Sequence, residues 1–257
     1  PWNIPILSSP VEYDMAPELP IDPYLLGFLI GDGNLRKRSI RFSTADQEIV
    51  DKLKGIIPDD LEIRYQSKYD YHISTKEHRQ KRRKNGTWCH ENSLLESLRD
   101  LGMAGKYSYE KFIPEVYKYA SVEDRIAILR GIMDSDGYCS NVGKSSHIGI
   151  RSSSEQLIKD VIEVLQSLGG FGTYTSHRTF CNGKEHRTAY RATLTFPAGI
   201  NPFSLARKRD AVQPRVRERK RFVRSIEPLE DEDSVCIRVE AEDSLYATRN
   251  CILTHNT

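Results

Sequence analysis

The stretches YLLGFLIGDG (residues 24–33) and ILRGIMDSDG (residues 128–137) decide the fold. Each is a mostly apolar segment of helical pattern that ends in aspartate followed by glycine. When the two are aligned on that final Asp-Gly, Gly27 matches Gly131 and Asp32 matches Asp136, an offset of 136 − 32 = 104 residues. The chain therefore contains one internal repeat.

The residues that follow the two stretches also correspond. SIRFSTADQEIVDKLKGII (39–57) and HIGIRSSSEQLIKDVIEVLQ (147–166) each predict a short strand, a polar helix start and an amphipathic helix. Further alternating segments follow at 61–74, 172–180 and 187–196. We expect a duplicated α+β domain with pseudo-twofold symmetry over residues 22–206. Its repeats cover about 22–110 and 111–206, and the element order is αββαββα.

The paired glycines predict how the two lead helices meet. A glycine inside a helix costs about 1 kcal/mol relative to alanine, so its recurrence suggests close backbone approach. Side-by-side packing would bring Asp32 and Asp136 together, and two adjacent carboxylates suit a hard cation such as Mg²⁺. Paired metal ions are a standard arrangement for phosphodiester cleavage. The alternative is that Gly33 and Gly137 are only left-handed caps that end two helices.

Composition narrows the class of protein. The 257 residues include 38 Lys and Arg against 36 Asp and Glu, but basic residues gather at 76–84 and 207–224 and acidic ones at 227–233. Such basic runs are typical of a polyanion binder, although solvated loops give the same pattern. The five scattered cysteines indicate a reducing compartment, which we take as cytoplasmic with a phage or prokaryotic gene as the source. Residues 1–21 have no basic start and read as an extended linker instead of a signal peptide.

The two stretches, and a lysine-containing segment between them, resemble the sequence blocks of a known family. LLGFLIGDG and LRGIMDSDG resemble the signature blocks of the LAGLIDADG homing endonucleases, and KFIP (111–114) resembles the lysine block of that family. The resemblance implies a monomeric enzyme that cuts double-stranded DNA at a long asymmetric site with Mg²⁺ or Mn²⁺. It implies metal binding by Asp32 and Asp136, helped by the carbonyls of Gly31 and Ser135, and a catalytic Lys111. An exposed lysine at a helix start is the alternative for Lys111, and Lys208 is only a weak candidate for a symmetric second lysine.

Basic and polar residues on the alternating strands are the candidates for DNA contact, since they could meet phosphates and base edges. A polar sheet face that simply meets solvent is the alternative. The candidates are Arg36, Lys37, Arg38, Arg41, Arg64, Gln66, Lys68, Arg178, Arg187 and Arg191. Among them, Arg64, Gln66 and Lys68 are expected to share one strand face because strands have a period of two.

The last segment, 221–257, predicts short strands and ends in Thr254-His255-Asn256-Thr257. An asparagine amide can attack its own carbonyl carbon, which forms a succinimide and breaks the bond to the next residue. A neighbouring histidine can protonate the leaving group, and a threonine hydroxyl can accept an acyl group.

VCIRVEAEDSLYATRNCILTHNT resembles the C-terminal splicing blocks of inteins, whose splicing (Hint) domain is all-β and needs no cofactor. The resemblance makes Asn256 the cyclising residue, His255 its assistant and Thr257 the first residue of the downstream extein, the host protein. Cys236 and Thr254 match a subgroup in which that cysteine is a nucleophile, and a buried structural thiol is the alternative.

Residues 207–220 are then a basic linker and 221–257 a splicing segment that requires an N-terminal intein segment, which we expect to be absent from this chain. The alternative functions are a DNA-binding relic without cleavage, or the C-terminal half of a split intein that acts only in splicing.

Overall fold

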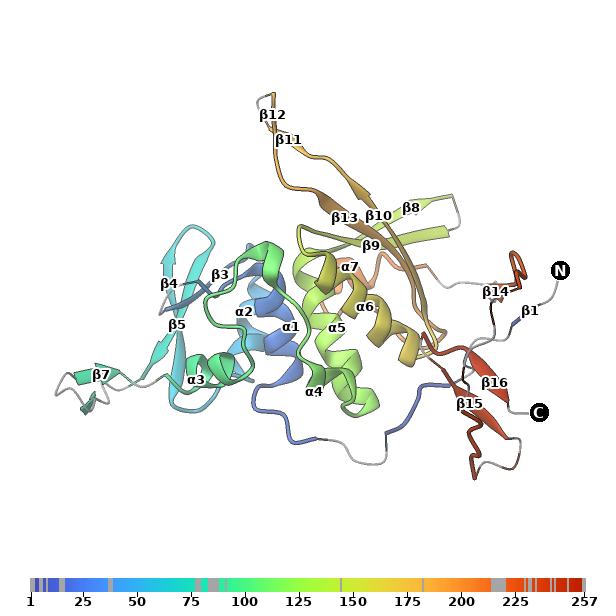
Figure 1. Cartoon of the computed structure of the whole chain (residues 1–257). Helices are drawn as coiled ribbons and strands as arrows, with labels where there is room; N and C mark the ends of the chain where they lie inside the picture. The colour runs from blue at the N-terminus through green and yellow to red at the C-terminus, as the bar shows by residue number, and fades with distance from the viewer. Residues whose placement is uncertain are drawn as a thin grey trace.

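The computed structural model of this chain describes most of the sequence (Figure 1). The described residues are 3–4, 7, 9–13, 17–36, 39–76, 80–82, 88–90, 92–143, 145–181, 183–213, 221–228, 230, 233, 235–240, 242, 244–248 and 250–255. In this part of the chain no helix is both long enough and apolar enough to cross a membrane.

The first repeat begins with a helix, α1 (Pro23–Asp32), whose start is fixed by local chemistry. The carboxylate of Asp22 accepts a hydrogen bond from the amide of Leu25 at 3.0 Å, and proline occupies the first helical position. The remaining elements of this repeat are β2 (Gly33–Asn34), β3 (Ile40–Ser43), α2 (Gln47–Lys54), β4 (Leu61–Ser67), β5 (Asp70–Thr75), β6 (Gln80–Arg82), β7 (Trp88–His90) and α3 (Ser93–Asp100).

The second repeat follows a short connection made of the 3-10 helix η1 (Ser108–Glu110) and α4 (Glu115–Lys118). Its elements are α5 (Val122–Asp136), β8 (Gly137–Val142), β9 (Ser145–Ser152), α6 (Glu155–Ser167), β10 (Phe171–His177), β11 (Phe180–Cys181), β12 (Lys184–Glu185), β13 (Ala189–Thr195) and α7 (Ala206–Arg209). The two antiparallel sheets have strand orders β2-β3-β5-β4 and β8-β9-β13-β10, so each strand of one has its counterpart in the other. The predicted α+β architecture with two equivalent repeats is confirmed.

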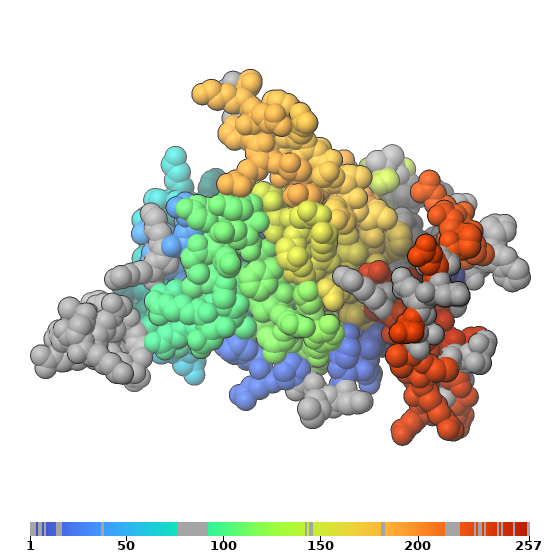
Figure 2. Space-filling model, in the orientation of Figure 1, coloured from blue at the N-terminus to red at the C-terminus, as the bar shows by residue number. Residues whose placement is uncertain are grey.

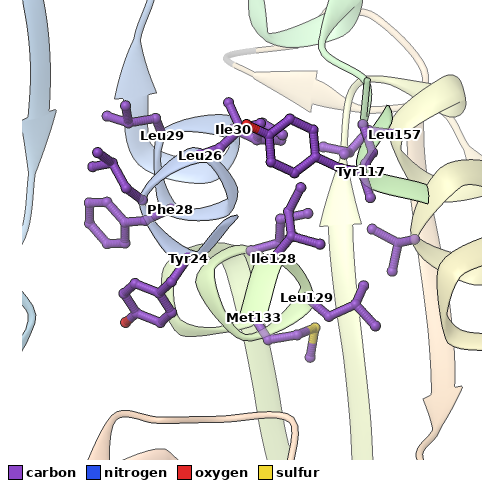
Figure 3. Close-up of a cluster of buried hydrophobic side chains, with 14 of the residues drawn as sticks. Tyr24, Leu26, Phe28, Leu29, Ile30, Tyr117, Ile128, Leu129, Met133 and Leu157 are labelled. Carbon is purple, nitrogen blue, oxygen red and sulfur yellow. The ribbon is translucent and has the colours of Figure 1, made fainter. Parts of the chain in front are cut away.

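Helices α1 and α5 lie at the centre of the molecule (Figure 1) and pack against each other (Figure 3). A Cβ atom on Gly27 would overlap the carbonyl oxygen of Ile128, and one on Gly131 would overlap that of Tyr24. Both glycines are therefore required for the backbones to meet, as their recurrence predicts. Around this contact, side chains of both repeats form one buried hydrophobic core that includes Leu25, Phe28, Ile128 and Met133.

The glycines that follow the two aspartates do not act as left-handed caps. Gly33 (φ −73°, ψ 134°) and Gly137 (φ −75°, ψ 153°) are extended and begin the strands β2 and β8. The need for glycine is steric, because a Cβ at either position would overlap the carbonyl oxygen four residues earlier, of Leu29 or Met133. The alternative interpretation of these turns as simple αL caps is wrong.

The flanking segments meet on one side of the second repeat. The strand β1 (Asn3–Ile4) pairs with β14 (Arg221–Phe222), and β15 (Leu245–Ala247) pairs with β16 (Leu253–His255). The expected N-terminal linker is docked, since the amide of Val11 donates to the carbonyl of Ser167 at 2.7 Å and Arg125 donates to the carbonyl of Val11. Part of the expected basic linker is docked as well. The Asn141 side chain donates to the carbonyl of Ala211 at 2.8 Å, and the amide of Gln213 donates to Ser146 at 2.8 Å.

Candidate active site and nucleic-acid interface

Asp32 and Asp136 end α1 and α5 side by side. A Cβ on Gly31 would lie 3.4 Å from the carboxyl carbon of Asp136, so the two helix ends are in contact there. Both carboxylates reach solvent, yet their surroundings penalise the charged form. Burial raises the pKa of Asp32, and burial together with the charge of Asp32 raises the pKa of Asp136 to about 6, against the lowering effect of Lys111 and Lys208.

This donor set fits a hard divalent cation. Two adjacent carboxylates whose repulsion is only partly relieved would gain from a bound positive charge, and Mg²⁺ prefers such oxygen ligands. Among the described residues, no group of three or more His, Cys, Asp or Glu forms a metal cluster. Asp32 and Asp136 would hold the ion, with the remaining positions left to water and phosphate oxygens.

Lys111 lies against the end of α1 and is only 5% exposed. Its ammonium group donates hydrogen bonds to the carbonyl oxygens of Leu29 (3.3 Å), Gly31 (2.9 Å) and Gly33 (2.8 Å). Burial lowers the pKa of Lys111 to about 8, although the nearby Asp136 and Asp32 favour its charged form. The alternative of an exposed lysine at a helix start is therefore wrong.

Lys208 occupies the matching position on α5. Its ammonium group donates to the carbonyls of Met133 (3.1 Å), Ser135 (3.4 Å) and Gly137 (2.8 Å), the residues 104 positions after the three partners of Lys111, and also to Asp134 (2.7 Å). The pKa of Lys208 is lowered by burial and by Arg207. The carbonyls of Gly31 and Ser135, which were expected to assist the metal, thus also accept hydrogen bonds from the two lysines.

Each lysine contacts the lead helix of one repeat, and its segment is also anchored on the other repeat. The hydroxyl of Ser154, at the start of α6, donates to the carbonyl of Lys111 at 2.6 Å. The segment of Lys208 docks on the start of α2, where Arg207 makes a bidentate pair with Asp46 at 2.8 Å and the amide of Ala206 donates to Glu48. The two lysines therefore connect the repeats at the candidate active site.

Asp134 supports the Lys208 side of the site. This buried carboxylate accepts a hydrogen bond from the Tyr24 hydroxyl at 2.7 Å and from the backbone amides of Ser204 and Leu205 at about 3.1 Å. Because those amides directly precede α7, the carboxylate fixes the start of the helix that carries Lys208.

The solvent-facing sides of both sheets carry arginines, and on the first sheet Glu62 and Asp70 share that side, with Glu62 paired to Arg64. In the first sheet, Arg41 pairs with His72 and His72 pairs with Arg64, so the three lie in one row across β3, β5 and β4. In the second sheet, Arg151 pairs with Arg191, whose Nε donates to the Tyr138 hydroxyl at 2.9 Å. The opposite sides carry buried residues such as Ile40, Phe42, Ile150 and Ala192.

Parts of this chain are similar to a known protein family and to known proteins. Residues 123–197 match the family model of the LAGLIDADG-like domain. This part of the chain is therefore similar to a LAGLIDADG-like domain. A "Replicative DNA helicase DnaB" of Mycobacterium intracellulare is 26% identical over 93% of this chain and 36% of its own length. The "Homothallic switching endonuclease" of Saccharomyces cerevisiae is 26% identical over 60% of this chain and 28% of its own. The chain thus spans about a third of the length of these relatives.

Solved structures of the homing endonuclease I-DmoI are also similar to this chain. One, of mesophilic variants, has a TM-score of 0.39 at 17% identity and covers 68% of this chain and 88% of its own. Another, in complex with DNA and Mn, has a TM-score of 0.37 at 16% identity over 68% of this chain and 89% of its own.

Two DNA contacts predicted for β4 need correction. The register between β4 and β5 shifts between Tyr65 and Ser67, which places Gln66 in a bulge, and Lys68 lies in the hairpin turn with φ 48°. Arg64, Gln66 and Lys68 therefore do not share one face, because the bulge interrupts the period of two.

The other predicted DNA contacts fall into three groups. Arg36, Arg41 and Arg191 are exposed, whereas Lys37 and Arg38 lie outside the described residues. Arg178 and Arg187 belong to the arm that extends β10 and β13 away from the body (Figure 2). Arg178 lies 3.5 Å from Glu185, and Arg187 covers the ring of Tyr109 at 3.7 Å, so neither sits on the sheet face.

Sequence reasoning missed Arg151, His72 and Tyr138. Arg151 was within reach, because His147, Gly149 and Arg151 alternate along β9 and the same period had selected Arg41. Nothing local distinguishes Tyr138 from a core tyrosine, since its contact with Arg191 joins strands far apart in sequence.

The structure describes only some of the predicted splicing residues. Asn256 and Thr257 lie outside the described residues. Within the hairpin of β15 and β16, Thr254 pairs with Tyr246 and His255 pairs with Leu245. Cys236 is exposed, so the alternative of a buried packing thiol is wrong in this structure.

Proposed function

We propose that this chain is a metal-dependent endonuclease that cuts both strands of a specific DNA site. The observation that carries the proposal is the pair of equivalent half-sites, Asp32 with Lys111 and Asp136 with Lys208, placed between two sheets whose outer faces carry arginines. The LAGLIDADG-like match and the endonuclease named among the relatives support the same class.

The residues of the site have separable roles. Asp32 and Asp136 bind the divalent ion, which when bound stabilises negative charge on phosphate oxygens and acidifies water. Lys111, with a pKa of about 8, is mostly cationic at neutral pH and can balance phosphate charge or orient water. The arginines of the sheet faces hold the DNA backbone and contact base edges in the major groove.

Cleavage of a library of long DNA sites in the presence of Mg²⁺ tests this function. Double-strand cuts at one recovered sequence, lost in Asp32→Asn and Asp136→Asn, are expected. A folded chain that binds DNA from the library without cutting any of it would instead support the alternative of a DNA-binding relic.

The finer part of the proposal is that the endonuclease lies within a protein-splicing element. Two observations support it. Similarity to this chain extends over 36% of a replicative helicase and, for a smaller part of the chain, over 28% of an endonuclease, as expected of an element that occurs within different proteins. Apolar side chains of the tail are strongly exposed, such as Val235 at 89% and Ile226 at 84%, and a complementary β segment would cover them.

Splicing is tested by fusing an extein after Thr257 and supplying an N-terminal intein segment. Cyclisation of Asn256 breaks its peptide bond to Thr257, whose amine leaves with a proton from His255, and mass spectrometry detects the released extein. Release that persists unchanged in Asn256→Ala would refute the splicing assignment without affecting the nuclease assignment.

A further inference from the structure

The segment that carries Lys111 to the active site is fixed differently on its two sides. After Lys111 it is held by α6, where Ser154 donates to the carbonyl of Lys111 at 2.6 Å and the amide of Ile113 donates to Asp160 at 2.9 Å. Before Lys111, a one-turn helix, η1, connects the first repeat to the site. The side chains of this turn make ring contacts.

Two tyrosines of this turn lie between two arginines. The guanidinium carbon of Arg36 is 4.0 Å from the ring centre of Tyr107, and its Nη2 donates to the Tyr107 hydroxyl at 3.2 Å. The rings of Tyr107 and Tyr109 are stacked at 5.3 Å with 24° between their planes. The guanidinium of Arg187 lies 3.7 Å from the ring centre of Tyr109.

The two arginines come from different repeats. Arg36 follows β2 of the first repeat, and Arg187 precedes β13 at the root of the arm of the second. The turn itself is closed by Glu110, whose carboxylate accepts a hydrogen bond from the amide of Tyr107 at 2.8 Å, so the two rings are held in stacking geometry. The contacts form a continuous row from one repeat through the turn to the other.

We propose that Tyr107 and Tyr109 are positioning residues that fix Lys111 by linking the turn before it to one arginine of each repeat. The inference deepens the proposed nuclease function and rests on it only for its catalytic consequence. At a partly exposed site each cation–π contact changes an equilibrium by only about two- to fivefold, so the row is weak enough to respond when DNA phosphates approach the arginines. Loss of a stacked ring has an effect of similar size.

Hydrogen exchange of the free, full-length protein tests the positioning directly, without any need for nuclease activity. Tyr109→Leu removes the ring that contacts both Tyr107 and Arg187, and we expect amide exchange over residues 108–113 to become at least about fivefold faster. Tyr109→Phe keeps the ring and should keep the protection. Exchange over 108–113 that is unchanged in Tyr109→Leu would overturn the proposal.

Single-turnover cleavage tests the consequence. With DNA saturating, we expect Tyr109→Leu to cut about fivefold more slowly or worse, with affinity for DNA in EDTA changed less than twofold and with Tyr109→Phe close to wild type. Tyr119→Leu is the control, because it removes another tyrosine ring that takes part in an aromatic contact, that with Tyr13, outside the site.

A Tyr109→Leu variant with faster exchange but wild-type cleavage would overturn the link between the turn and Lys111. If wild-type protein cuts no DNA, the proposed nuclease function fails, while the exchange measurement still decides whether the tyrosines hold the turn.

Discussion

Lys208 donates hydrogen bonds to the carbonyl oxygens at the end of α5 just as Lys111 does at the end of α1. The two ammonium groups reach corresponding residues of the repeats although nothing in the surrounding sequence aligns them. Each lysine contacts the lead helix of one repeat, and its segment is also anchored on the other repeat. The candidate active site is therefore symmetric in chemistry even though the two lysines come from unlike structural contexts.

This symmetry predicts that the lysines are of comparable importance. We expect Lys111→Met and Lys208→Met each to slow cleavage by about a hundredfold, since each removes one positive charge near the reacting phosphate. Supercoiled plasmid that carries the target measures this, because nicked and linear products are resolved. Lys54→Met, at a 52% exposed lysine in a surface ion pair, is the control. A Lys208→Met variant with the wild-type rate would contradict the prediction.

The two carboxylates should matter for cleavage and not for DNA affinity. We expect Asp32→Asn and Asp136→Asn to lose at least about a hundredfold in cleavage rate, because a neutral amide is a poor ligand for the divalent ion. Gel-shift affinity in EDTA should stay within a few fold. Asp100→Asn alters another carboxylate at a helix end, that of α3, and should cut normally.

Asp136 should also destabilise the metal-free fold. Burial and the neighbouring charge of Asp32 raise its pKa to about 6, so Asp136→Asn should increase the free energy of unfolding by about 1 kcal/mol after solvent screening is allowed for. Urea denaturation in EDTA measures the change. A loss of stability in this variant would show that the carboxylate makes net favourable contacts.

The pH dependence follows from the same raised pKa. Below about pH 6 the Asp136 carboxyl takes up a proton and the cleavage rate should fall, and more Mg²⁺ should move that fall to lower pH because the ion competes with the proton. Stability changes in the opposite direction. The folded-state pKa lies above the unfolded value of about 3.9, so the contribution of this group to stability increases as pH falls from about 6 to about 4.

Denaturation at pH 4.5 and pH 7 in EDTA, compared between wild type and Asp136→Asn, isolates this contribution. Wild type should gain stability at the lower pH relative to the variant. This pH-dependent difference should become smaller when saturating Mg²⁺ replaces EDTA.

The glycine contact should tolerate no side chain. Gly27→Ala places a Cβ against the carbonyl of Ile128, and Gly131→Ala places one against that of Tyr24, so we expect each to cost about 3 kcal/mol or more of stability. Urea denaturation measures the cost. Gly55→Ala is the control, since its Cβ would meet the nearest atom at 3.5 Å and its φ is −81°. An unchanged midpoint in Gly27→Ala would mean that the helices can separate.

The duplication, the order of helices and strands, the glycine contact between the lead helices and the pairing of Asp32 with Asp136 could all be predicted from the sequence. Each depends on a local pattern that recurs at a fixed offset, and helical and strand periods are written into consecutive residues. The sheet face of Arg41 and Arg191 follows from the same period.

The tertiary structure alone decided the rest. Lys208, only a weak candidate in the sequence, proved to be the counterpart of Lys111, Arg36 and Arg187 contact Tyr107 and Tyr109, and the bulge at Gln66 and the turn at Lys68 keep these two residues off the face of Arg64. The first two depend on contacts between residues more than 70 positions apart, and hydrogen bonds and cation–π contacts of that range leave no periodic trace. The last depends on the pairing of β4 with β5, since a single unpaired residue reverses the direction of every side chain after it.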